Sequence, residues 1–186
     1  MDNFSFYLSY YGLILGLSVA QVASGFLNAI GARHRIRIGW LTPTLAVFIF
    51  LDITSFWLFA WAIRNSITIT WGWMYSGLII AIAYFIASGL VFPRNIDEWP
   101  DLDQYYWKHK RWVIGGILIP NVISFTQTTI YHPSNVDAAY LISQAAYWIP
   151  VVLLLFSRRS WLDLTLLGLA SASYIANAFF PTNSAI

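Results

Sequence analysis

Asp52 has the most obvious chemistry in this sequence, because it is an acid in the middle of an apolar run. The run extends from Thr42 to Arg64 and is long enough to cross a bilayer. If a helix begins at Thr42, with Pro43 in its first turn, Asp52 lies ~15 Å further along, close to the midplane of a hydrocarbon layer ~30 Å thick. An ionised carboxyl at that depth costs ~3 kcal/mol or more. Asp52 therefore indicates a functional or partnered group that faces protein or water and not lipid.

No basic partner for Asp52 is visible in the sequence. No Lys, Arg or His lies at a similar depth, and Arg64 is roughly 18 Å away along the same helix. A carboxyl without a cation in a medium of low dielectric favours its protonated form, which donates one hydrogen bond and accepts others. Two hypotheses follow: Asp52 exchanges a proton, or it ties neighbouring helices together.

Polar side chains in the later apolar runs are candidates for a site that includes Asp52. Four amides fall near the middle or in the outer half of these runs: Asn121, Gln127, Gln144 and Asn177. Five hydroxyl groups could join them: those of Ser55, Ser124, Ser143, Tyr147 and Tyr174. Helical spacing places Asn121 with Ser124, and Tyr174 with Asn177, on shared faces. The pattern predicts a polar crevice, open to the outside and ending at Asp52, that binds a proton or a solute. The alternative is that the amides only hold helices together through hydrogen bonds worth ~1 kcal/mol or less.

Several classes of active site lack the residues that they need. The histidines, which haem ligation requires inside a bundle, lie at the ends of runs or between them: His34, His109 and His132. Cysteine is absent, no lysine lies within a run, and intramembrane proteolysis needs paired acids, a zinc site or an activated serine. The sequence therefore predicts no catalytic residue, no metal site and no cofactor, and we expect a protein that is not an enzyme.

The composition is typical of an integral membrane protein. Of the 186 residues, 59% are hydrophobic, 18% are aromatic and only 10% are charged, whereas soluble domains have about 25% charged residues. The formal net charge of +2 comes with no basic aromatic stripe, so nucleic acid is not an expected partner. The first run lacks the basic start and small-residue cleavage site of a signal peptide, and we expect it to be retained.

Six apolar runs of spanning length follow one another: 6–29, 43–64, 70–92, 112–131, 137–156 and 161–180. Two of them contain a proline, Pro120 and Pro150, which is expected to kink the helix. The fifth and sixth runs begin with an S-x-x-D capping pattern, Ser134 with Asp137 and Ser160 with Asp163. The predicted fold is a single all-α transmembrane domain over residues 1–186.

The distribution of basic residues predicts the orientation. All lysines and arginines except Arg64 follow the first, third and fifth runs. Because positive residues stay on the cytoplasmic side, both termini are expected on the non-cytoplasmic side of a multi-pass protein in the cytoplasmic membrane.

The segment 93–111 is the one sizeable connection, and it is expected to be cytoplasmic. From Asp101 it has acids in a first helical turn and bases in a last turn, which predicts a short interfacial helix before the fourth transmembrane helix. Tyr105, Tyr106 and Trp112 are expected against lipid headgroups, and a docking site for a cytoplasmic partner or an anionic lipid is the alternative.

Small residues form possible packing faces on two runs. Gly12 and Gly16 have G-x-x-x-G spacing in the first run, and Gly168 begins a similar pattern in the sixth. These glycines are predicted to allow close helix packing, either within one subunit or against a second copy or another membrane protein.

Several segments together give a resemblance: FSFYLSYYGLILGLSVAQVASGF, RHRIRIGW, SFWLFAWAIR and DLDQYYWKHKRW. Over its first two thirds the chain is similar to a group of uncharacterised small polytopic proteins of the bacterial inner membrane. The resemblance implies a polytopic protein with a basic first turn, and it brings no known activity.

Two functions remain open from the sequence. The first is a non-enzymatic interaction or accessory protein of the cytoplasmic membrane, whose partners are the lipid bilayer and a second copy or another membrane protein. The second is a proton-linked carrier or small conduit that uses Asp52 at the bilayer midplane. A carrier built from six short helices would need a dimer to enclose a sizeable cavity.

Overall fold

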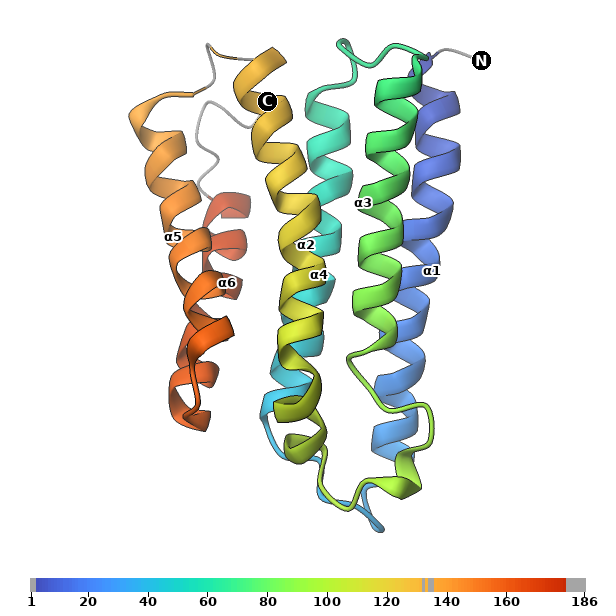
Figure 1. Ribbon diagram of the computed structural model, residues 1–186, viewed down its shortest axis with the longest axis vertical. Helices are drawn as coiled ribbons and strands as arrows, with labels where there is room; N and C mark the ends of the chain where they lie inside the picture. Colours follow the sequence, from blue (N-terminus) through green and yellow to red (C-terminus); the bar gives the residue numbers. More distant parts are fainter. Residues whose placement is uncertain (1–2, 132, 134–135, 180–186) are drawn as a thin grey trace.

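The regular elements of the chain are all helices in the computed structural model, which describes residues 3–131, 133 and 136–179 (Figure 1). The predicted all-helical class is therefore confirmed. In chain order the elements are α1 (Asn3–Gly31), α2 (Leu41–Ala62), α3 (Trp71–Gly89), the short 3-10 helix η1 (Ile96–Glu98), α4 (Leu102–Tyr131), α5 (Ala138–Phe156) and α6 (Ser160–Phe179).

Five of the helices, α1 to α5, are long and apolar enough to cross a membrane. Over its described residues, α6 is not among them. Its first turn contains Asp163, and several Ser and Thr residues follow along the helix. The length and composition of these helices fit the predicted association with a membrane.

α2 lies at the centre of the bundle because more than one of its faces is apolar. It packs against α1, α4 and α6, while α3 packs between α1 and α4, and α5 packs on α6 (Figure 1). Neighbouring residues of α2 are buried in pairs, including Phe48 with Ile49 and Asp52 with Ile53. These pairs widen the buried stripe of α2, so that more than one neighbouring helix packs against it. This central position places Asp52 within reach of several helices.

The first and third connections interlock at the basic end of the bundle. The Arg37 amide donates to the Pro100 carbonyl at 2.9 Å, and the Leu102 amide donates to the Arg37 carbonyl at 2.9 Å. Gly39 has a φ of 67°, and a side chain there would strike the carboxyl of Asp103. This close approach joins the start of α2 to the start of α4.

Asp103, and not Thr42, caps the start of α2. The Leu41 amide donates to Asp103 Oδ1 at 3.1 Å, and the Thr42 hydroxyl donates to the Leu102 carbonyl at 2.9 Å. α2 therefore begins at Leu41 and not at Thr42, because a carboxylate from another helix satisfies the Leu41 amide and the Thr42 side chain turns toward that helix.

Residues 102–111 form the first turns of α4 itself, so the helix expected before the fourth apolar run continues directly into it. Tyr105 and Tyr106 are 6% and 2% exposed, because they pack into the bundle and not on its surface as expected. Trp112 is 74% exposed and does face outward.

The glycines that permit close helix packing are not those predicted. A Cβ on Gly12 would lie 3.5 Å from Trp57 Nε1, but no atom lies within 4 Å of a Cβ on Gly16 or Gly168. Within the helices, a Cβ would lie 2.5 Å from the Phe92 ring at Gly25, 2.7 Å from the Tyr7 hydroxyl at Gly77 and 3.1 Å from Ala87 at Gly116. Tight packing therefore concentrates on the α1–α3 and α3–α4 contacts.

Candidate functional site

Asp52 is fully buried and accepts hydrogen bonds from four side chains. The Tyr84 hydroxyl donates to Oδ2 at 2.8 Å, the Tyr147 hydroxyl donates to Oδ1 at 3.1 Å, and the Tyr174 hydroxyl also donates to Oδ1. The Asn121 amide lies 3.4 Å from both oxygens. These five residues are called the Asp52 cluster below.

Each member of the Asp52 cluster comes from a different helix. Asp52 lies on α2, Tyr84 on α3, Asn121 on α4, Tyr147 on α5 and Tyr174 on α6. Five helices therefore meet at one carboxyl, which makes the cluster the polar centre of an otherwise apolar bundle.

Aromatic packing fixes the positions of the phenol rings. The Phe48 ring lies 6.3 Å from the rings of both Tyr147 and Tyr174, and Phe56 meets Tyr84 edge to face at 5.0 Å. Contacts of this kind limit the rotation of the rings, so the hydroxyls stay directed at the carboxyl.

The chemistry of the cluster is that of a carboxyl among groups that carry no charge. None of the ion pairs within the described residues includes Asp52. A phenol hydroxyl can both donate and accept a hydrogen bond, and the Asn121 amide supplies a further donor. The cluster can therefore satisfy an ionised carboxylate, or share a proton between the acid and a phenol oxygen, without a cation.

Of the four predicted amides, the structure brings only Asn121 to Asp52. Gln127 donates to the Ser76 hydroxyl at 3.0 Å, and the Gln144 carbonyl oxygen accepts from the Trp148 ring nitrogen at 3.1 Å. Asn177 is exposed on the outer part of α6. Gln127 thus forms an interhelical hydrogen bond, as in the alternative interpretation, whereas the hydrogen bond of Gln144 lies within α5.

Tyr147 and Tyr174 were candidates from the sequence, whereas Tyr84 was not. Its position near the middle of an apolar run was a usable signal, because a tyrosine hydroxyl buried at that depth needs a partner. Asp52 is such a partner, although the two residues are on different helices and 32 positions apart.

A second buried polar group lies at the basic end of the bundle. Lys110 Nζ lies 2.6 Å from Asp163 Oδ2 and donates to the Ser157 carbonyl at 2.7 Å. The Tyr106 hydroxyl donates to the same Asp163 oxygen at 2.9 Å, and the Trp107 ring lies 4.3 Å from Nζ. Lys110 and Asp163 are 3% and 0% exposed, so this ion pair is enclosed by the bundle.

The S-x-x-D patterns do not form the predicted capping boxes. Asp137 is itself the N-cap of α5 and accepts from the Tyr140 amide at 2.7 Å, while Ser134 lies outside the described residues. The Asp163 side chain turns away from its own helix end to meet Lys110, because the pairing of two buried charges outweighs a local cap.

An apolar layer separates the ion pair from the Asp52 cluster. Lys110 and Asn121 lie about three turns apart on α4, and Asp163 and Tyr174 have the same spacing on α6, roughly 16 Å. The side chains between them on α4, α5 and α6 include fully buried apolar residues: Ile114, Ile117, Leu154, Leu167 and Ala170. The two polar groups therefore lie on the same helix faces with dry packing between them.

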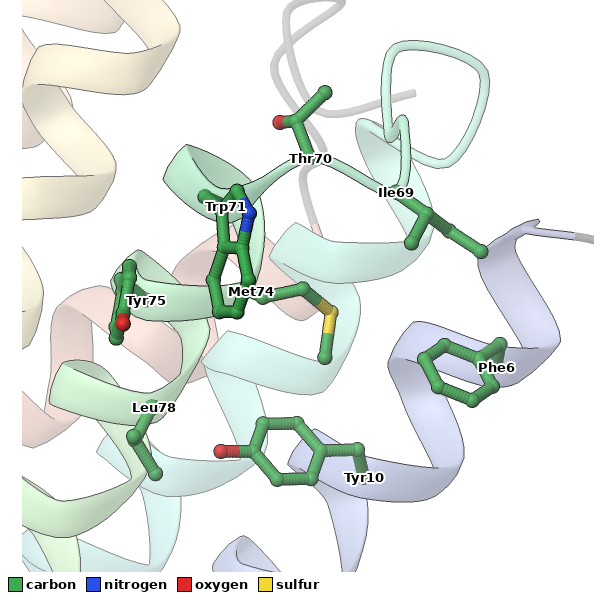
Figure 2. A pocket seen from close by; sticks show the side chains of 8 residues that line it. All are labelled: Phe6, Tyr10, Ile69, Thr70, Trp71, Met74, Tyr75 and Leu78. Atoms are coloured by element: carbon green, nitrogen blue, oxygen red, sulfur yellow. The ribbon is translucent and has the colours of Figure 1, made fainter.

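A cavity of about 510 Å³ lies apart from both polar groups, at the other end of the bundle. Figure 2 shows its walls, which come from α1, the start of α3 and the connection before it: Phe6, Tyr10, Ile69, Thr70, Trp71, Met74, Tyr75 and Leu78. The walls carry no charged side chain, so the cavity offers an apolar surface with a few hydroxyls.

Comparison with known protein families, with curated proteins and with solved structures finds no match, so the resemblance to small bacterial inner-membrane proteins stays a prediction.

Proposed function

We propose that this protein is a non-enzymatic, proton-linked carrier or conduit in which the Asp52 cluster binds and releases the proton. The observation that carries the proposal is a fully buried carboxyl with four hydrogen-bond donors and no cation. Ionisable groups inside membranes are costly, and they commonly mark ion pathways and proton relays. A cluster that only joined helices could use a neutral amide in place of the acid at lower cost.

The hydroxyls support both protonation states of Asp52. When the carboxyl is ionised, the hydroxyls of Tyr84, Tyr147 and Tyr174 and the Asn121 amide donate to its oxygens. When it is protonated, the acid donates to one phenol oxygen, and that hydroxyl rotates to another acceptor. Proton exchange then needs only rotation of hydroxyl groups within the cluster.

Polar side chains support a route between the cluster and the end of the bundle opposite the basic connections. Asn121 is only partly buried, and Ser124 and Thr128 follow it on α4, also partly buried. Tyr140 on α5 interacts with Thr128 and Gln144. Toward the basic end, fully buried apolar side chains of α4, α5 and α6 close this conformation, although the buried Ser88 hydroxyl lies one turn from Tyr84 on that side.

The proposed setting is a bacterial cytoplasmic membrane crossed six times, with α6 as the sixth span and both termini outside. The placement of the basic residues supports it, because the connections after α1 and α3 interlock and the turn after α5 binds Lys110. The first turns of α4 would then lie at the cytoplasmic interface, and the proposed route would open to the outside.

Titration of the carboxyl in the purified protein tests the proton-binding step. Infrared difference spectra between acid and alkaline conditions should contain the carbonyl band of a protonated carboxyl in the wild type. Asp52→Asn, which keeps the side-chain size and one acceptor oxygen, should lose one component of that band, while the other seven acids still contribute to it. Asp97→Asn is the matched control, because Asp97 is an exposed acid in the 90–101 connection.

Proton flux into proteoliposomes tests transport. With a potassium diffusion potential and a pH-sensitive dye inside, the wild type and Asp97→Asn should acidify the lumen faster than empty vesicles do. Asp52→Asn should reduce the rate to that of empty vesicles. A carboxyl band that is identical in the wild type and in Asp52→Asn would disprove proton binding at Asp52, and wild-type flux equal to that of empty vesicles would disprove transport.

The second candidate is an interaction or accessory protein in which the Asp52 cluster only holds the helices together. The complete enclosure of Asp52 favours it, because no solute can reach the carboxyl without movement of the helices. This candidate predicts that the wild type and Asp52→Asn both show the proton flux of empty vesicles. It also predicts that crosslinking in native membranes recovers a stable partner or a second copy of the chain.

A further inference from the structure

The turn between α5 and α6 carries a compact set of unpaired positive charges. Arg158 and Arg159 are exposed and have no acidic partner among the described residues. Arg111 of α4 is also exposed, and its Nε donates to the Leu155 carbonyl at 3.1 Å, which brings its guanidinium to the same turn. These three residues are called the arginine turn below.

No exposed acid offsets the arginine turn. The nearest acid in the sequence, Asp163, is buried and already neutralised by Lys110. By contrast, two arginines of the first connection meet acids of the third: Arg35 lies 3.1 Å from Asp97, and Arg37 lies 3.5 Å from Asp101. Arg33, Arg94 and Lys108 are also exposed and form no ion pair within the described residues, but the α5–α6 turn brings three such charges together.

Exposed aromatic side chains flank the three arginines. Phe156 and Trp161, on either side of Arg158 and Arg159, are 72% and 61% exposed, and Trp112, next to Arg111, is 74% exposed. Tryptophan side chains prefer the boundary between lipid headgroups and acyl chains. Guanidinium groups bind phosphate through two parallel hydrogen bonds. The turn thus combines groups suited to a headgroup phosphate with groups suited to the chains below it.

We propose that the arginine turn binds the headgroup of an anionic phospholipid, with Trp112, Phe156 and Trp161 against its acyl chains. A lipid fits better than a free anion because the exposed aromatic groups on both sides would otherwise meet only water or neutral lipid. The site is independent of Asp52, and it does not require that the protein moves protons.

Native mass spectrometry of the detergent-purified full chain tests the proposal. Phosphatidylglycerol should be retained in preference to phosphatidylcholine with the same acyl chains. The double variant Arg158→Gln with Arg159→Gln should bind phosphatidylglycerol roughly 30-fold more weakly, since each basic residue near an anionic lipid surface contributes about fivefold in affinity. Arg35→Gln with Arg64→Gln is the matched control, because it removes the same charge from positions outside the turn and should keep wild-type binding.

Two further measurements keep the test decisive. The wild type should lose phosphatidylglycerol as salt is raised, a readout that does not depend on the folding of a variant. Inorganic phosphate should not displace the lipid at equal concentration. Equal retention of the two lipids, equal weakening in the control variant, or displacement by phosphate alone would overturn the proposal.

Discussion

The Asp52 cluster and the Lys110–Asp163 pair solve the same problem, a buried carboxylate, in different ways. Asp163 meets a cation at 2.6 Å, and its other oxygen, Oδ1, has no hydrogen-bond partner in the described part of the chain. Asp52 has no cation, but donors occupy both of its oxygens. The comparison indicates that charge neutralisation stabilises one site and hydrogen bonding stabilises the other, so substitutions should affect them differently.

The largest effect is expected when Lys110 is replaced by Met. The fully buried Asp163 then loses its only cation, and removal of one partner of a buried ion pair typically costs about 3–5 kcal/mol. Unfolding of the detergent-solubilised protein, followed by helicity as a denaturing detergent is added, measures the change.

A double variant provides the control for that prediction. Lys110→Met with Asp163→Leu removes both charges and should recover most of the lost stability, because an apolar pair of similar volume commonly replaces a buried ion pair without loss. If the double variant is as unstable as Lys110→Met alone, packing around Lys110 and not an unpaired charge explains the loss.

Local sequence patterns were sufficient to predict the helices, but they did not indicate this ion pair. The apolar runs of spanning length mark the helices, and an acid alone in such a run marks Asp52. Lys110 and Asp163 each had a sufficient local explanation, as a base in a last helical turn and an acid in a capping pattern. They are 53 positions apart, and only the packing of α4 beside the α5–α6 turn brings them together.

The Asp52 cluster was predictable only in part, for a related reason. The sequence shows how deep a polar residue lies in its run, and that depth correctly placed Asn121, Tyr147 and Tyr174 near Asp52. It does not show how each helix is rotated, which directs Gln127 to Ser76 and leaves Asn177 exposed. Tyr84 was missed because tyrosine is common in apolar runs near membrane surfaces, and its depth was not weighed.

The two Asp52 oxygens accept different numbers of phenol hydroxyls. Removal of one hydroxyl from the cluster is therefore expected to cause a loss of stability between those of the largest and smallest predicted effects. Oδ2 accepts from one phenol hydroxyl, that of Tyr84, whereas Oδ1 accepts from two, those of Tyr147 and Tyr174, and the Asn121 amide lies 3.4 Å from both oxygens. Tyr84→Phe should therefore cost about 2 kcal/mol of stability and Tyr147→Phe about 1 kcal/mol, in the ranges for charged and ordinary hydrogen bonds. The same unfolding measurement compares the two variants. Equal losses would mean that the two oxygens are equivalent and that Tyr84 holds no special position.

The smallest effect is expected at an ion pair that resembles Lys110–Asp163 in distance but not in burial. Arg35 and Asp97 lie 3.1 Å apart, and their side chains are 65% and 55% exposed. Water screens exposed charges, and such pairs contribute about 0–1 kcal/mol, so Arg35→Gln should shift the unfolding free energy by less than about 0.5 kcal/mol. A shift as large as that of Lys110→Met would show that contact distance and not enclosure sets the strength of these pairs. Because Arg35 belongs to the connection that interlocks with residues 90–101, a large loss would also show that this end of the bundle depends on its surface charges.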